Sequence, residues 1–586
     1  MTMRTLTLTR RGIGFCCGLL WGAGLLAGKD VAIDATHPVF ELEGGQATAL
    51  AVTVSGREYP AGYRRTFLEI TNTSAADVPL KRIVVADLPA PAGARIAGEC
   101  AGSPVVAGTT FFGVEHPFAE NTVAHGRVRC AFPVMLPLRP GEKVTVSFVQ
   151  GSAPEPSQLR RSFAAYLESE RPRPAAPFLL HNTWYNLGYS NPFTEQQELD
   201  LIATVGRELT ERRGAKIDGF VLDDGWDDTH TLWRFHAGWP NGLKGMHAAT
   251  AQWGAVPGIW ISPWGGYNKP KQERLAAAAS EGFEIRAGGF SLAGPRYYAR
   301  FRELCLQAVR EGGVGFFKFD GIGAKAEGVI DPVAGRDFDA MLRLIAELRA
   351  QRPGLYISQT VGTWPSPWWL LHVDNIWRGG EDHSFAGVGS DRQRWITYRD
   401  AQVYANVVQR APLFPLNALM LHGIILSRRA EHLATTEPGD FTAEVRSFFG
   451  SGAQLQELYL SPELLTAGNW DDLAAAAKWA RANADVLRDS HWIGGDPAKL
   501  EPYGWAAWTP RLGIVTLRNP SDQPARFTLE PGAAFELPSA ASRKFQIKPA
   551  YAGDMALGTE WASGRPVEVA LQPFEVRVLE FRPVVE

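Results

Sequence analysis

Hydrophobic and polar positions change their spacing twice along this chain of 586 residues. Over residues 33–170, short runs of strand-forming residues, such as 66–70 and 144–148, alternate with turns rich in Gly, Pro and Asn. Short runs of this kind, separated by turn residues, are typical of antiparallel sheets. The first segment therefore predicts an N-terminal β-sandwich.

The first change follows the Pro-rich stretch 171–177. From 176 to 495, apolar runs alternate with long amphipathic segments such as 194–213 and 337–351. The runs that predict strands lie at 178–181, 219–222, 258–262, 315–319 and 355–358. Because strands that alternate with helices form parallel sheets, we predict a (β/α)8 TIM barrel over 176–495.

The second change returns the chain to short strand-like runs, at 512–517, 525–529 and 576–581. Residues 500–586 therefore predict a C-terminal antiparallel β-domain, a small sandwich. The expected fold class is α/β, with one TIM barrel flanked by two β-domains.

The N-terminus has the pattern of an export signal. Arg4, Arg10 and Arg11 precede the apolar stretch 12–28, which ends in small residues. We expect residues 1–28 to be removed and the mature protein to be secreted or periplasmic. The general secretory and twin-arginine routes both remain open. The stretch is shorter than the ~20 apolar residues of a membrane helix, so no permanent membrane span is expected.

Charge and cysteine content narrow the classes of function. Lys and Arg number 59 against 62 Asp and Glu, a net charge of -3, so nucleic acid is not an expected partner. Cys100 and Cys130 can pair in an oxidising compartment, whereas Cys305 lies in a helical pattern that predicts a buried free thiol. No cysteine or histidine spacing is that of a metal site, and we expect neither a metal nor another cofactor.

Charged residues stand where predicted strands end. They are Asp223 and Asp224, then Lys318 and Asp320, and then Asp382, which follows Trp377-Arg378. Carboxylates beside an apolar strand are costly unless they bind a ligand or a partner. The carboxyl ends of barrel strands are also where barrel enzymes carry their active sites. A glycosidase, with a carbohydrate substrate, is the function that this pattern favours.

Retaining hydrolysis of a glycoside needs one carboxylate as nucleophile and another as acid and then base. Asp320 is the expected nucleophile, because Lys318 lies on the same face of the strand, where its ammonium can keep Asp320 ionised or bind a sugar hydroxyl. Asp382 is the expected acid/base. It lies in a glycine-rich loop, where partial desolvation of a mobile carboxyl can raise its pKa enough for it to protonate a leaving group. Glu381 and Asp391 are its rivals.

These motifs, in their order and spacing, resemble the clan D α-glycosidases, the α-galactosidases and α-N-acetylgalactosaminidases of glycoside hydrolase families 27 and 36. The resemblance covers roughly 176–430. Lys318 and Asp320 match the family's nucleophile motif, and Trp377-Arg378 with Asp382 matches its acid/base loop.

The same resemblance implies a sugar-binding role for further residues. Asp223, Asp224 and Trp226 match the family motif that binds the 4- and 6-hydroxyls of galactose, and Lys318 and Arg378 are expected to hold other hydroxyls. Trp184 is similar to the aromatic residue that follows the family's first strand and lines the sugar subsite. Trp260 fits either the sugar subsite or the core. The chain departs from family 27 at Gly225 and Gly362, where that family has cysteines.

One loop bears on the choice of sugar. The family's Trp-Pro loop sets one residue before the Trp and one after the Pro against the sugar's 2-substituent, and here these are Thr363 and Ser366, around Trp364. The resemblance implies that small residues leave room for an acetamide. We therefore expect a retaining exo-α-glycosidase that releases terminal α-linked N-acetylgalactosamine.

Four alternatives remain. The first is an α-galactosidase acting on galacto-oligosaccharides or polysaccharides, and the second is an endo-acting α-glycosidase whose cleft the β-domains extend. The third is a non-catalytic barrel that binds glycans. A metal-dependent hydrolase is the fourth, although the strand ends carry no clustered His and Asp ligands.

Overall fold

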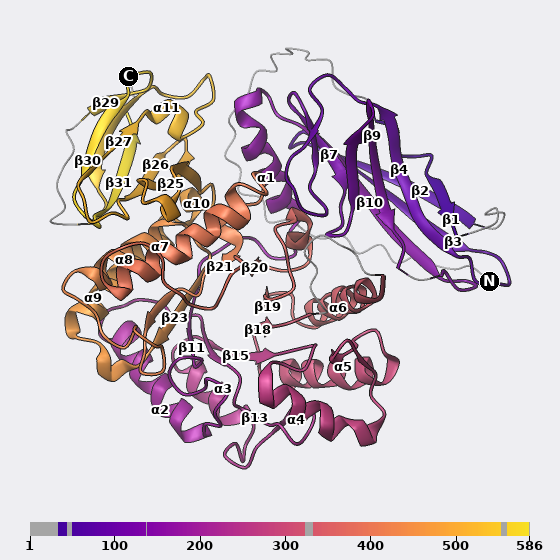
Figure 1. Ribbon diagram of the computed structural model, residues 1–586, viewed down its shortest axis with the longest axis horizontal. Helices are drawn as coiled ribbons and strands as arrows, with labels where there is room; N and C mark the ends of the chain where they lie inside the picture. The colour runs from indigo at the N-terminus through magenta and orange to yellow at the C-terminus, as the bar shows by residue number, and fades with distance from the viewer. Residues whose placement is uncertain (1–32, 44–49, 136, 323–331, 552–559, 585–586) are drawn as a thin grey trace, which may run out of the picture.

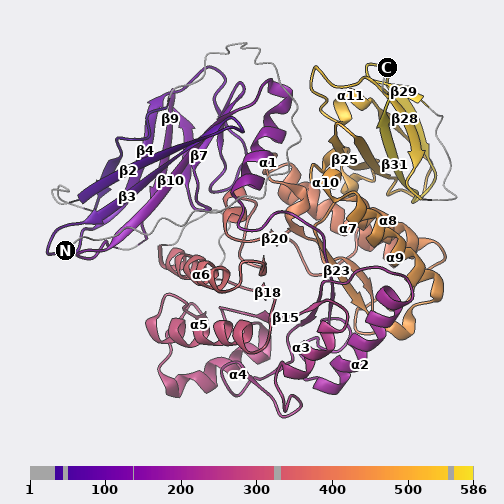
Figure 2. The same cartoon turned by 180° about the vertical axis from the view of Figure 1, so that it is seen from behind.

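The computed structural model describes residues 33–43, 50–135, 137–322, 332–551 and 560–584. The predicted export signal, 1–28, lies outside these residues. The described chain has three parts, with a barrel between an N-terminal and a C-terminal β-domain (Figures 1 and 2). Within the described ranges, no helix is both long and apolar enough to cross a membrane.

The barrel sheet is parallel throughout and runs in the order β21-β20-β19-β18-β15-β12-β11-β23-β22. Its strands are β11 (Phe178–Asn182), β12 (Gly219–Leu222), β15 (Val256–Ile261), β18 (Phe316–Phe319), β19 (Tyr356–Gln359), β20 (Asn375–Trp377), β21 (Leu419–Met420), β22 (Ile424–Leu426) and β23 (Leu455–Leu460). Only residues 421–423 separate β21 from β22, so the two edges of the sheet are halves of one strand and the sheet closes. The predicted TIM barrel is confirmed.

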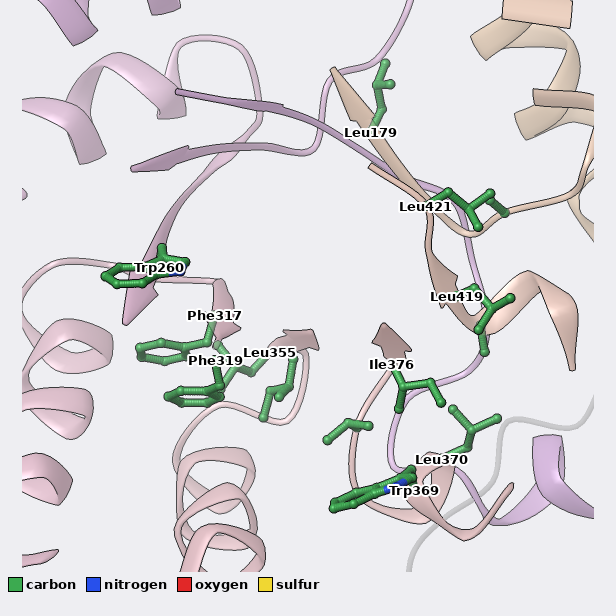
Figure 3. Close-up of a cluster of buried hydrophobic side chains, with 14 of the residues drawn as sticks. Leu179, Trp260, Phe317, Phe319, Leu355, Trp369, Leu370, Ile376, Leu419 and Leu421 are labelled. Carbon is green, nitrogen blue, oxygen red and sulfur yellow. The ribbon is translucent and has the colours of Figure 1, made fainter. Parts of the chain in front are cut away.

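Helices surround this sheet. They are α2 (Glu195–Gly206), α3 (Lys244–Ala251), α4 (Asn268–Ala278), α5 (Pro295–Arg310), α6 (Pro332–Gln351), α7 (Asp391–Val403), α8 (Asp440–Gly450) and α9 (Ala467–Ala482). The strands are buried on both faces, which explains why they read as continuous apolar runs. Figure 3 shows part of the resulting core, in which the rings of Phe317 and Phe319 stack with centroids 4.9 Å apart. There are also two short hairpins. One pairs β13 (Asp227–Asp228) with β14 (Arg234–Phe235) in the loop between β12 and α3, and the other pairs β16 (Ile285–Arg286) with β17 (Gly289–Phe290) between α4 and α5.

The N-terminal part is the predicted sandwich of two antiparallel sheets. One contains β1 (Val39–Leu42), β4 (Leu80–Pro89), β9 (Arg127–Pro133) and β8 (Glu120–Ala124). The other contains β2 (Leu50–Tyr59), β3 (Tyr63–Asn72), β10 (Lys143–Ser152), β7 (Thr110–Val114), β6 (Val105–Ala107) and β5 (Arg95–Ile96). A separate apolar core fills the space between them, and α1 (Leu159–Glu170) leads on to the barrel (Figure 1).

The three cysteines of the described residues are unpaired. Cys100 and Cys130 are both buried and free, and the Cys100 Sγ lies 3.4 Å from the Ser103 Oγ. The possible disulfide between Cys100 and Cys130 is therefore not formed in this structure. Cys305 is a buried free thiol in α5, as its helical pattern predicted.

The C-terminal part has its own core between two sheets. The larger sheet contains β24 (His491–Gly494), β25 (Tyr503–Thr509), β26 (Leu512–Arg518), β31 (Val576–Pro583), β28 (Lys544–Pro549) and β29 (Glu560–Ala562), and the smaller pairs β27 (Ala525–Leu529) with β30 (Val567–Leu571). Its first strand, β24, starts before the predicted boundary at 500. Two short helices, α10 (Ala484–Leu487) and α11 (Pro531–Ala534), flank these sheets. Buried Arg518 joins this part to α7 by donating to the Thr397 hydroxyl and to the Gln393 carbonyl.

Candidate active site

Asp320 lies directly after β18 at the carboxyl end of the barrel, where three side chains donate hydrogen bonds to its carboxylate. The Trp260 indole, from β15, is 2.9 Å from Oδ2. The hydroxyls of Tyr267 and Thr360 reach Oδ1 at 3.0 and 2.5 Å. Only 9% of Asp320 is exposed, so these contacts fix the carboxylate in place. Charge-assisted hydrogen bonds of this kind suit a group that must stay negative in order to attack.

A second carboxylate, Asp223, lies beside Lys318. The Lys318 ammonium and the Asn182 amide both donate to the Asp223 Oδ2 at 2.8 Å. Burial alone would lower the pKa of Lys318, but the charges of Asp223, Asp320 and other carboxylates outweigh it and raise that pKa above its usual value. Lys318 thus hydrogen-bonds Asp223, while its influence on Asp320 is through charge.

The next residue, Asp224, belongs to a buried network rather than to an open pocket. Its Oδ1 accepts a 2.6 Å hydrogen bond from Arg274, which also binds Asp227 at 2.7 and 2.8 Å. Burial raises the pKa of Asp224 to about 6, although the Arg274 charge opposes the shift. The network ties the loop after β12 to α4.

Trp226 does not face Asp320 and Asp382, contrary to the expectation that it binds sugar beside them. Only 2% of it is exposed, its ring stacks on Trp233, and its indole donates to the carbonyl of Trp260 at 2.9 Å. The cause is Gly225, whose φ of 128° turns the chain outward and whose missing Cβ lets the Asn191 carbonyl approach closely. Trp226 therefore supports Trp260 from behind.

Asp382 lies at the same end of the barrel as Asp320. The Trp184 indole donates to its Oδ2 at 3.2 Å, and the His422 Nε2 is 3.8 Å from its Oδ1. Half of the side-chain surface is open, but protein encloses the carboxylate on its other sides. Burial, together with the negative charges of Asp320 and Asp223, raises the pKa of Asp382 to about 6 against the opposing charge of Lys318. A carboxyl with this pKa can carry a proton at mildly acidic pH.

The two rivals of Asp382 are placed differently. Asp391 begins α7 and pairs with Arg394 at 3.2 Å and with His432 at 3.2 Å, which is the arrangement of a structural ion pair. Glu381 is exposed, and its backbone N–H donates to the Tyr398 hydroxyl at 2.7 Å. Neither residue has the contact with Trp184 that holds Asp382.

Arg378 is fully buried, so the expectation that it holds sugar hydroxyls is not met in this structure. Its guanidinium donates to the backbone carbonyls of Glu381 and Asp382 at 2.9 and 3.0 Å, and to those of Leu421 and Gly379. Burial lowers the pKa of Arg378 to about 10. The side chain positions the loop that carries Asp382.

The loop expected to face the 2-substituent of the sugar is largely covered. Ser366 is fully buried against Gly102 of the N-terminal sandwich, and the indole of Trp364, itself 6% exposed, donates to the carbonyl of Ala101 at 2.9 Å. Both residues belong to the domain contact rather than to a sugar site. Thr363 is half-buried and donates to the carbonyl of Thr360 at 2.7 Å, and Thr360 is the residue whose hydroxyl binds Asp320.

Four residues of the site were not predicted from the sequence. Asn182 ends β11 and binds Asp223, and Thr360 follows β19 and binds Asp320. His422 interrupts the strand formed by β21 and β22 with a φ of 62°, and Glu457 lies within β23. A polar residue inside an apolar strand was the available signal for Glu457.

Glu457 is buried and lacks a partner at Oε2, while its Oε1 accepts a 2.7 Å hydrogen bond from the Tyr459 hydroxyl. Burial raises the pKa of Glu457 to about 7 against the opposing charge of Lys318. Burial also lowers the pKa of His422 well below its usual value, so that His422 faces Asp382 as a neutral ring. More carboxylates therefore act on Lys318 than the expected pair, Asp320 and Asp382, because Asp223 and Glu457 act on it as well.

No group of three or more His, Cys, Asp or Glu side chains in the described part of the chain is arranged to hold a metal ion. The carboxylates of the site are held by Lys, Arg and hydrogen-bond donors instead.

Comparison with known proteins places this geometry on a known fold. No protein-family model and no curated protein sequence matches the chain. Among solved structures, it is similar to the galactosidase domain of an α-galactosidase-sucrose kinase (14% identity, TM-score 0.62, 89% of this chain and 79% of that one).

Two bacterial enzymes are similar to the same extent. One is a family 36 α-galactosidase variant from Geobacillus stearothermophilus solved with stachyose (13% identity, TM-score 0.61, 91% and 81% covered). The other is the α-galactosidase from Lactobacillus brevis (12% identity, TM-score 0.63, 92% and 80% covered). The resemblance drawn from the motifs thus extends to the whole architecture, and the chain has the three-part fold of the family 36 α-galactosidases.

Proposed function

We propose that this protein is a retaining α-glycosidase that removes a terminal α-linked sugar of the galactose type. The observation that carries the proposal is the pairing of two unlike carboxyls at one end of the barrel. Asp320 is fixed by three hydrogen-bond donors, whereas Asp382 has a pKa raised to about 6. A nucleophile must be ionised and an acid must carry a proton, so the two environments suit the two roles.

The proposed reaction has two displacements. The Asp320 carboxylate attacks the anomeric carbon while the bond to the leaving oxygen breaks and Asp382 gives that oxygen its proton. The resulting Asp382 carboxylate then takes a proton from water, whose oxygen attacks the same carbon and releases Asp320. The buried Arg378 holds the Asp382 loop during both steps through its backbone carbonyls.

The substrate class follows from the polar side chains and from the similar structures. Asp223, held by Lys318 and Asn182, offers a fixed carboxylate to sugar hydroxyls. The similar structures are named α-galactosidases, and their titles include complexes with stachyose and raffinose. An α-galactoside is therefore the best-supported substrate.

An α-N-acetylgalactosaminide is the second candidate. Thr363 is small and half-buried beside Thr360, and a small residue at this position is what the motif resemblance associates with a 2-acetamido group. Ser366 no longer supports this choice, because it is buried against Gly102. We place the enzyme outside the cytoplasm on the export pattern of residues 1–28.

The test is release of the aryl alcohol from matched aryl α-galactosides and aryl α-N-acetylgalactosaminides. Wild type is compared with Asp320→Asn and, as a control, with Glu381→Gln. We expect Asp320→Asn to lose turnover by roughly four orders of magnitude or more, as for the removal of other catalytic nucleophiles, and Glu381→Gln to keep it. Full activity in Asp320→Asn would overturn the proposal. The faster of the two sugars decides between the substrate candidates.

A further inference from the structure

A cavity of about 420 Å³ lies on the outer side of the barrel, away from the catalytic carboxylates. Its floor is made of Ile259 and Ile261 of β15 and Phe317 of β18. Side chains alternate along a strand, so these residues face outward, whereas Trp260 and Lys318 face the barrel interior. The barrel sheet itself separates the cavity from the active site.

The cavity opens where the layer of helices is thin. α3 has 8 residues and α5 has 16, which correspond to lengths of about 12 and about 24 Å. One face of α5, with Arg300, Leu304 and Ala308 at helical spacing, lines the space that the shorter helix leaves over β15, together with Glu311 just after the helix. Figure 1 shows α3 and α5 on either side of β13 and β15.

The walls of the cavity are aromatic. Trp226, Trp233 and Phe235, from the segment after β12, line it opposite α5. The rings of Trp226 and Trp233 stack with centroids 6.1 Å apart, and Phe235 lies 4.9 Å from Trp226. The volume falls within the range of about 300–1,000 Å³ of small-molecule sites. Flat walls over an apolar floor fit a flat ring system.

Two arginines that line the cavity form no ion pair with a carboxylate in the described residues. Arg234 and Arg300 both line it, and no carboxylate within the described ranges forms an ion pair with either. Arg300 donates to the Leu232 carbonyl at 3.1 Å. Burial and the nearby Arg234 charge lower the pKa of Arg300 and outweigh the opposing charges of Glu281 and Glu303. Glu311, which accepts from Gln307, caps the C-terminal end of α5 eleven residues after Arg300, about 16 Å away along the helix axis. The charge of the two arginines is therefore not neutralised by Glu311.

We propose that this cavity binds a small monoanion with a flat aromatic body. Its carboxylate or sulfonate meets Arg234 and Arg300, and its rings lie between the Trp233–Phe235 wall and the apolar floor. Arginine is suited to this task because its planar guanidinium pairs with both oxygens of such an anion. The site is separate from the proposed glycosidase centre and does not depend on that activity.

The test uses two probes that differ only in the anionic group. They are 1-anilinonaphthalene-8-sulfonate and the uncharged N-phenyl-1-naphthylamine, whose fluorescence rises in an apolar site. Affinity is measured for wild type, Arg300→Gln and Ala308→Phe, a substitution that fills the cavity from a partly buried position. Arg310→Gln is the control, because Arg310 is on the same helix but pairs with Glu303 and does not line the cavity.

We expect wild type to bind the sulfonate more tightly than the uncharged probe. Arg300→Gln weakens the sulfonate about tenfold, as expected for a lost charge-assisted hydrogen bond, and leaves the uncharged probe unchanged. Ala308→Phe abolishes the binding of both, and Arg310→Gln affects neither. Equal affinity of wild type and Ala308→Phe would place the probes elsewhere. An equal loss of affinity for the sulfonate in Arg300→Gln and Arg310→Gln would show that only the net charge of the protein matters. Either result overturns the proposal. If Ala308→Phe fails to fold by its melting curve, the comparison of Arg300→Gln with Arg310→Gln still decides.

Discussion

The indole N–H of Trp260 donates a hydrogen bond of 2.9 Å to the Oδ2 of Asp320. On the neighbouring strand, Lys318, two residues before Asp320, is the register partner of Trp260. The carbonyl of Trp260 accepts a hydrogen bond from the indole N–H of Trp226. The proposed nucleophile is thus held by the barrel sheet and by the core behind it. This rigid support is what precise attack on an anomeric carbon requires.

Removal of one hydroxyl tests the hydrogen bonds to Asp320. Tyr267→Phe deletes the donor at 3.0 Å without changing the ring. A hydrogen bond to a charged group contributes about 1.5–3 kcal/mol, so kcat/KM should fall roughly ten- to a hundredfold. Tyr189→Phe is the matched control, because Tyr189 is also exposed but packs its ring, tilted by 31°, against Trp184 instead of contacting Asp320. Equal kinetics for the two variants would contradict the role of Tyr267.

The pH dependence of activity tests the role of Asp382. Burial raises its pKa to about 6, so the acid form persists up to that pH and is lost above it. With a leaving group that needs a proton, kcat/KM should therefore decline as pH rises through about 6. A dinitrophenyl leaving group needs no proton, so its kcat/KM should lack this decline. The same decline for both substrates would assign the acid to another residue.

Glu457 should make the protein less stable at neutral than at acidic pH. Its folded-state pKa of about 7 lies above the ordinary value of 4.5. The stabilisation of the folded protein that comes from this raised pKa is therefore complete below about pH 4.5 and is lost as pH rises through 7. Glu457→Gln removes this loss, which amounts to at most about 3 kcal/mol. The melting temperature of Glu457→Gln should rise relative to that of wild type as pH increases from 4.5 to 8. A constant difference across that range would contradict the assignment.

The Lys318–Asp223 pair should behave as a buried ion pair. Lys318→Met leaves the Asp223 charge without its 2.8 Å partner and should cost about 3–5 kcal/mol of stability. Adding Asp223→Asn removes the orphaned charge, so the double variant should recover much of this loss in a denaturant titration. Activity should stay low in both, because Asp223, the carboxylate proposed to bind sugar hydroxyls, is disturbed or absent. Additive destabilisation in the double variant would show that the pair is not coupled.

The fold was largely predictable because it rests on local patterns. Strands buried on both faces give continuous apolar runs, and the strand-end carboxylates at Asp223 and Asp320 interrupt those runs abruptly. These two features need no knowledge of long-range contacts. They suffice to predict the barrel and the end of it that carries the acidic residues.

The contacts of individual side chains were not predictable in the same way. The φ of 128° at Gly225 sends Trp226 to the core, although its sequence position suggests the sugar site. Ser366 is covered by Gly102, a residue of another domain, and no local pattern reveals such a contact. Arg378 serves backbone carbonyls that only the folded loop brings together. Positions set by tertiary contacts therefore needed the structure.

The most direct test of the central claim is to trap the covalent intermediate on Asp320. An aryl 2-deoxy-2,2-difluoro-α-galactoside with an activated leaving group should glycosylate the enzyme faster than water releases it. After proteolysis, mass spectrometry should find the added sugar on the peptide that contains Asp320, and Asp320→Asn should remain unlabelled. A label on Asp223 or Asp382, or turnover of aryl α-galactosides with inverted product and no label, would contradict the account.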